Sequence, residues 1–172
     1  MAHADTQTQQ AEGFISDLGN QAIGVLETNA NNDDVLRSEF SRILNKNFDM
    51  DTIARFSLGR YWGVATDSEK KEYTTLFKDM VVDVYTERFS DYSNQKLVVN
   101  GAKPAGRNDV IVNSSVVGKG NPIRVDWRVR DGRVIDVIVE GVSMSVTQRN
   151  DFASIIQRNG GNVSGLINHL KK

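Results

Sequence analysis

Hydrophobic residues change their spacing twice along this chain. Up to Asn94 they recur about every 3.6 positions, as on one face of a helix, and beyond it they recur every second position among β-branched residues. From Ser145 the helical spacing returns. This order of helices, about four antiparallel strands and helices again predicts an α+β fold in which helices pack against a sheet.

The helical segments carry their own start signals. A first amphipathic helix is expected over 9–29, and N-cap residues mark the later starts. These N-caps are, in chain order, Asp33, Asp49, Thr66 and Asn162. Thr66 and Glu69 have the spacing of a capping box, and the wide apolar face beyond them predicts a long helix to Phe89. With a further helix from Ser145, we expect about six or seven helices.

Four segments have the composition of strands. They cover 97–100, 109–117, 123–130 and 133–141. Asp131 and Gly132 form a two-residue hairpin signal between the last two. The third strand alternates apolar and charged residues and so has one wet face, whereas the fourth is apolar on both faces, which is typical of a central strand.

Composition removes several classes of chemistry. The chain has no cysteine, which excludes disulfides, thiolate metal sites and cysteine nucleophiles. Its histidines, His3 and His169, lie outside any cluster of ligands, and the glycine patterns of serine hydrolases and phosphate loops are missing. With 21 basic and 22 acidic residues the charge is balanced, so nucleic acid is not an expected partner. We expect no catalytic residue, metal or cofactor.

The chain is expected to be soluble and to form one domain. No apolar run approaches the roughly 20 residues of a membrane-spanning helix. Residues 1–8 are expected to form a flexible tail, and 9–172 a single domain. The segment Ala2-His3-Ala4 has the small-x-small form of a signal cleavage site, which favours a secreted protein, although an Ala-rich tail has the same appearance.

Charged residues on the expected strands allow two further interpretations. Arg124, Arg128 and Arg130 share the polar face of one strand, where they would hold a phosphate or an acidic partner, or simply form a solvated face. Asp136 and Glu140 lie about 13 Å apart by strand rise, too far for paired carboxylate catalysis. A single Asp136 in a cone-shaped pocket would still suit the base of a small isomerase or dehydratase.

Two stretches of the sequence resemble the MlaC family, the toluene-tolerance auxiliary proteins of an ABC-type lipid transport system. The first is 48–62, with its Phe-Asp start and Leu-Gly-Arg-x-Trp end, and the second is 136–143, followed by Arg149 and Phe152. The resemblance extends from Gln9 to Leu170. The chain departs from the family at Arg133 and Gln148, where the family often has an aromatic residue.

The resemblance implies a carrier and not an enzyme. Such a protein is periplasmic and moves phospholipid between an outer-membrane lipoprotein complex and an inner-membrane ABC transporter with MCE domains, which maintains outer-membrane lipid asymmetry. It also implies a twisted antiparallel sheet packed with helices around a lipid pocket. One branch of the family accompanies hopanoid synthesis, so a sterol-like ligand is an alternative. A pure adaptor that docks through the arginine strand is another.

The expected binding residues follow from this interpretation. Burying one methylene is worth about 0.8 kcal/mol, so a diacyl lipid needs an apolar pocket to cross water. The candidate lipid-pocket residues are Leu76, Met80, Val84, Val112, Val125, Trp127, Val137 and Val139. The candidates for contact with the headgroup or a partner are Arg55, Arg60, Arg124, Arg128 and Arg130.

Overall fold

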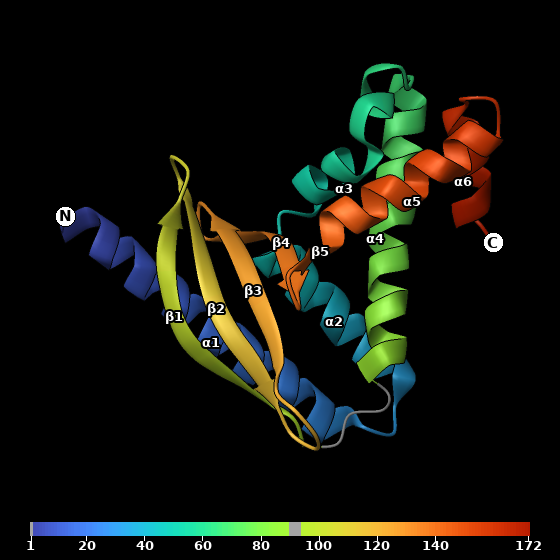
Figure 1. Ribbon diagram of the computed structural model, residues 1–172. Helices are drawn as coiled ribbons and strands as arrows, with labels where there is room; N and C mark the ends of the chain where they lie inside the picture. The colour runs from blue at the N-terminus through green and yellow to red at the C-terminus, as the bar shows by residue number, and fades with distance from the viewer. Residues whose placement is uncertain (1, 90–93) are drawn as a thin grey trace.

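Helices and strands follow one another in the computed structural model as the sequence predicts for an α+β fold, and residues 2–89 and 94–172 are described (Figure 1). The elements before the sheet are α1 (Ala2–Asn29), α2 (Asp33–Asn47), α3 (Met50–Leu58), the 3-10 helix η1 (Gly59–Gly63) and α4 (Asp67–Phe89). The strands are β1 (Lys96–Ala105), β2 (Asp109–Val117), β3 (Ile123–Arg130), β4 (Arg133–Val139) and β5 (Val142–Ser143). The chain ends with α5 (Met144–Arg158) and α6 (Val163–Leu170). None of the helices in the described ranges has the length and apolarity that a membrane crossing requires.

The sheet is antiparallel throughout, with its strands in the order β1-β2-β3-β4-β5. The hairpin between β3 and β4 turns at Asp131 and Gly132, whose φ angles are 50° and 76°. Two successive positive φ angles belong to the tight turn that matches strand twist, so the predicted hairpin is confirmed. The short β5 was not predicted, because two residues carry no periodic signal.

Strand β4 lies between β3 and β5, so it is an inner strand of the sheet as expected, although β5 is short. Along its length β4 pairs with β3, whereas on the other edge it pairs with β5, through Ile138 with Ser143 and Val139 with Val142. Val134 also forms an isolated parallel bridge to Phe48. Helices α3 and α5 also contact β4. Helices therefore cover the apolar residues of β4.

Two of the predicted helix starts are confirmed in atomic detail. The backbone N–H of Thr52 donates to Asp49 Oδ1 at 3.2 Å. At the start of α4 the N–H of Glu69 donates to Thr66 Oγ1 at 3.1 Å, and the N–H of Thr66 donates to Glu69 Oε1 at 3.0 Å. These reciprocal bonds are a capping box, which satisfies backbone donors that the first helical turn leaves unpaired.

The start of α2 differs from prediction, and that of α6 is at the predicted residue but lacks its capping bond. Helix α2 is capped by Asn32, whose side chain accepts from the N–H of Val35 at 3.1 Å, while Asp33 is already helical. Asn162 occupies the N-cap position of α6, but its side chain donates instead to the carbonyl of Asn159 at 3.0 Å. Neighbouring Asn and Asp residues compete for one cap, and sequence alone does not separate them.

Helix α1 begins at Ala2, so it includes most of the segment that was expected to be a flexible tail. Met1 of that segment lies outside the described residues. Alanine and glutamine, which recur over 2–11, are good helix formers, and the first glycine comes only at Gly13. Local helix propensity therefore extends the helix to the N-terminal side of Gln9, where the amphipathic pattern begins.

The buried apolar side chains form two clusters. The sheet cluster joins α1 and α2 to one face of the sheet, around Phe40, Val112 and Val134. The helical cluster joins α3, η1, α4, α5 and α6, around Tyr73 and Phe152. Figure 1 shows this division, with α1 running behind β1 and β2 while α3, α5 and α6 gather about the upper part of α4. Phe48, at the end of α2, packs against both clusters.

Candidate functional site

A cavity of about 250 Å³ lies where the two clusters meet, and we call it the α4 cavity. The C-terminal end of α2, helices α3 and α4, strand β4 and the first two turns of α5 form its wall. From α4 it receives Phe77, Met80, Val81 and Val84. The lining continues to Arg88, and the eleven helical steps from Phe77 to Arg88 span about 16 Å. The α4 cavity is therefore elongated and mostly apolar.

Helix α3 contributes a stripe of three residues to the same wall. Met50, Ile53 and Ser57 recur at intervals of three and four, which places them on one face of the helix. The helix is anchored beside α4, because Tyr73 Oη donates to the carbonyl oxygen of Ala54 at 2.7 Å. Burial of Tyr73 raises its pKa, so the phenol remains a neutral donor.

The rim of the α4 cavity is polar and partly exposed. Val84 and Arg88 on α4, and Thr147 and Asp151 on α5, are exposed to solvent. Arg88 is the only cation among the described residues that line the cavity. Tyr85 lies beside it, and burial raises the pKa of the Tyr85 phenol. A ligand with a long apolar part and one polar end fits this arrangement.

Asp136, which sequence reasoning considered as a possible base, is used to hold the start of α5. Its Oδ2 accepts from Ser143 Oγ at 2.5 Å, and its Oδ1 accepts from the backbone N–H groups of Val137 at 2.9 Å and Ser145 at 3.1 Å. Both oxygens are therefore engaged within the protein. This geometry favours a structural role at the junction of β5 and α5 over proton abstraction.

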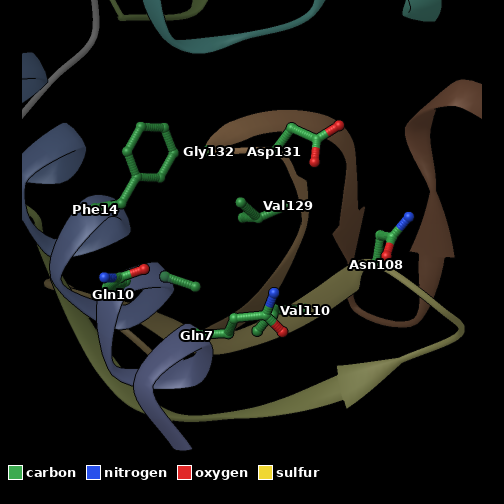
Figure 2. A pocket seen from close by; sticks show the side chains of 9 residues that line it. Gln7, Gln10, Phe14, Asn108, Val110, Val129, Asp131 and Gly132 are labelled. Carbon is green, nitrogen blue, oxygen red and sulfur yellow. The ribbon is translucent and has the colours of Figure 1, made fainter. Parts of the chain in front are cut away.

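A second cavity, of about 320 Å³, lies between the N-terminal half of α1 and the hairpin end of the sheet. Figure 2 shows the side-chain amides of Gln7, Gln10 and Asn108 around it, with Phe14 and Val129 completing the wall. Amide groups in contact with hydrocarbon lose their hydrogen bonds to water. Although it is larger, this cavity is less suited to an acyl chain than the α4 cavity.

Three of the predicted pocket residues, Met80, Val84 and Val137, line the α4 cavity. The other five lie elsewhere in the interior. Leu76 packs against the helical cluster, Val112 and Trp127 belong to the sheet cluster, and Val125 pairs with Val139 across β3 and β4. Of these five, Trp127 contacts a residue of the cavity wall. Its ring meets that of Phe48 edge-on, with centroids 6.5 Å apart.

The five predicted arginines do not line the α4 cavity. Arg55 lies over the ring of Trp62 at 5.7 Å, and Arg60 lies over Tyr61 at 5.0 Å. Arg124 pairs with Asp126 at 2.8 Å. Their role toward a headgroup or partner stays a prediction.

Arg128 and Arg130 hold one buried carboxylate between them. Their Nε atoms lie 2.6 Å and 2.7 Å from the oxygens of Asp109. Hydrogen bonds from Arg130 and Arg128 hold the pKa of Asp109 below its usual value. A carboxylate with a lowered pKa stabilises the fold fully above its unfolded pKa of about 3.9, and this contribution is lost as the pH falls through the lower, folded pKa.

We expect Asp109→Asn to lower the free energy of unfolding by about 1.5–3 kcal/mol at pH 7, because hydrogen bonds to a charged group are lost. Urea unfolding from pH 8 to 2 should show a constant difference from wild type down to about pH 4, and a shrinking one below it. Asp51→Asn is the control, since its ion pair with Lys78 is exposed and worth under about 1 kcal/mol. A difference that persists unchanged at pH 2 would contradict this explanation.

Sequence reasoning missed Ser57, Arg88 and the α5 residues of the cavity. The spacing of Met50, Ile53 and Ser57 is visible in the sequence. The stretch 48–62 was interpreted as a family signature, however, and not as part of a cavity wall. Within the described residues no three His, Asp or Glu side chains gather as a metal site.

Comparison with known proteins gives consistent results over most of the chain. The family model described as MlaC protein matches residues 16–172. The toluene tolerance protein ttg2D of Pseudomonas putida is 25% identical over 175 residues, which cover 95% of this chain and 79% of that protein. The intermembrane phospholipid transport system binding protein MlaC of Haemophilus influenzae is 25% identical over 112 residues, 60% of this chain and 52% of that protein.

A solved structure has the same fold. It is the phospholipid-binding protein from Ralstonia solanacearum in complex with a phospholipid, with a TM-score of 0.80 and 24% sequence identity. The match covers 95% of this chain and 94% of the other. The predicted combination of helices and an antiparallel sheet is therefore a known architecture.

Proposed function

Because this chain belongs to the MlaC family, we propose that it is a periplasmic carrier that holds the acyl chains of a phospholipid in the α4 cavity. The Haemophilus relative is named for binding in an intermembrane phospholipid transport system, and the Ralstonia protein of the same fold binds a phospholipid. These names support phospholipid over the sterol-like ligand considered from sequence. The function is transport and not catalysis.

The observation that carries the proposal is the apolar α4 cavity at the junction of the two clusters. Its apolar wall offers the methylene groups of a lipid an environment like the membrane interior. Removing each methylene from water is favourable by about 0.8 kcal/mol. Transfer of a lipid from bilayer to protein is then nearly neutral, so small differences in affinity suffice for loading and release.

We expect loading to move the helices that surround the α4 cavity, because the cavity is small. At about 250 Å³ it lies below the range of roughly 300–1,000 Å³ that is typical of pockets for small molecules, and a diacyl lipid is larger than these. The exposed rim between α4 and α5 is where separation costs least, because Val84, Thr147 and Asp151 there are already in contact with solvent.

The same proposal includes partners that load and unload the carrier. We expect these to be an outer-membrane lipoprotein complex and an inner-membrane ABC transporter with MCE domains, and the resulting transport to maintain outer-membrane lipid asymmetry. Arg124, Arg128 and Arg130, which are partly exposed on the sheet face opposite α1, are candidates for contact with such a partner.

Native mass spectrometry of the purified protein, followed by solvent extraction, tests the carrier function. We expect a bound mass of one phospholipid per chain, released as phospholipid on extraction. A hopanoid in its place would identify the alternative ligand. A lipid-free protein that also takes up no lipid from phospholipid vesicles would refute the carrier and favour the adaptor.

A further inference from the structure

One buried hydroxyl in the α4 cavity has no partner in the protein. Ser57 is 1% exposed, and its Oγ is the one buried side-chain oxygen or nitrogen without a hydrogen-bond partner among the described residues. Hydroxyls that are removed from water are nearly always hydrogen-bonded, because leaving one unpaired costs free energy. The missing partner of Ser57 therefore requires an explanation.

Other hydroxyls in the helices find a local partner. Thr28, Thr74 and Thr86 each donate to the carbonyl oxygen four residues earlier, at 2.7 to 2.8 Å. Ser57 makes no such bond to Ile53. Since Ser57 belongs to the α3 stripe that faces the cavity, its hydroxyl is available to whatever occupies the cavity.

We propose that the Ser57 hydroxyl donates a hydrogen bond to an ester carbonyl of the bound lipid, an inference that rests on the carrier function proposed above. A hydrocarbon chain offers no acceptor. The ester carbonyls are the polar atoms closest to the chains, so they enter an apolar cavity with them. A phosphate is a poor partner for so enclosed a group, because one neutral hydroxyl does not compensate a buried charge.

The contact would also orient the lipid. Helix α3 packs beside the first half of α4, where Tyr73 bonds to Ala54 and Lys78 pairs with Asp51. An ester held by Ser57 places the glycerol end beside α3 and α5. The acyl chains then lie against the apolar residues Met80 and Val81 of α4.

The test uses competition between two lipids that differ only in their carbonyls. Lipid-free protein is incubated with vesicles that contain equal amounts of diester phosphatidylcholine and its dialkyl-ether analogue of the same chain length. Native mass spectrometry then gives the ratio of the two bound lipids. We expect wild type to be enriched about 3- to 10-fold in the diester form, the worth of one neutral hydrogen bond.

Ser57→Ala should reduce this enrichment to about one, and Ser57→Cys, a similar shape with a weaker donor, should lie between. Ser164→Ala, which removes an exposed hydroxyl from α6, should match wild type. Equal loading of both lipids by wild type, or an unchanged preference in Ser57→Ala, would overturn the ester contact while the carrier function stands. No loading of either lipid by wild type would overturn both.

Discussion

Replacing Met80 with glutamate is expected to abolish lipid binding while the protein remains folded. Met80 lies in the middle of the α4 face of the cavity, one turn from Phe77 and one turn from Val84. In the lipid-free protein the new carboxylate has water within reach, because the cavity opens at its rim. A bound acyl chain would remove that water, at a cost of several kcal/mol, so affinity should fall by more than about 100-fold.

Vesicle uptake followed by native mass spectrometry measures this loss, and the far-ultraviolet circular dichroism spectrum reports the fold. Thr75→Glu is the matched control, since Thr75 lies on the exposed face of the same helix. It introduces the same charge outside the cavity and should load like wild type. If Met80→Glu loaded lipid as well as Thr75→Glu, the acyl chains would have to lie elsewhere, with the amide-lined cavity of Figure 2 as the next place to examine.

Phe152→Ala is expected to cause the largest loss of stability, about 3–5 kcal/mol in the free energy of unfolding. Phe152 is 2% exposed, and its ring meets those of Tyr73 and Phe77 edge-on, with centroids 6.0 Å and 6.2 Å apart. Truncation leaves a void among rings on α4 and α5 that the surrounding helices fill only in part. Equilibrium urea unfolding measures the change.

Phe56→Ala provides the comparison for this measurement. Phe56 is 42% exposed, and its main contact is with the guanidinium of Arg149, which lies 4.8 Å from the ring centroid. Its loss should cost about 1 kcal/mol or less. Similar losses for the two variants would show that the helical cluster is not organised around Phe152.

Local signals account for what sequence reasoning predicted correctly. Two such signals are the capping box of Thr66 and Glu69 and the turn at Asp131 and Gly132. Each involves only a few neighbouring residues, so it can be recognised in a single sequence. The change of hydrophobic period places the sheet between two groups of helices for the same reason. The family resemblance, and not periodicity, supplied the carrier interpretation.

The walls of the cavity were harder to predict. The alternation of apolar and polar residues along a strand indicates which residues share a face of the sheet, but not which helix covers that face. Val112 and Val137 lie on one apolar face of the sheet, yet Val112 is buried beneath α1 and α2 while Val137 reaches the cavity. Ser57 was missed because a serine in a helix usually bonds to its own backbone. That it does not do so is visible only in three dimensions.

The division of the apolar interior has a consequence for folding cooperativity. The sheet cluster and the helical cluster share Phe48, and the α4 cavity occupies much of the boundary between them. In the empty protein the two halves are joined by α2 against α4 and by α3 and α5 against β4. We expect an acyl chain in the cavity to pack against both clusters at once, so that bound lipid makes unfolding of the two halves more cooperative.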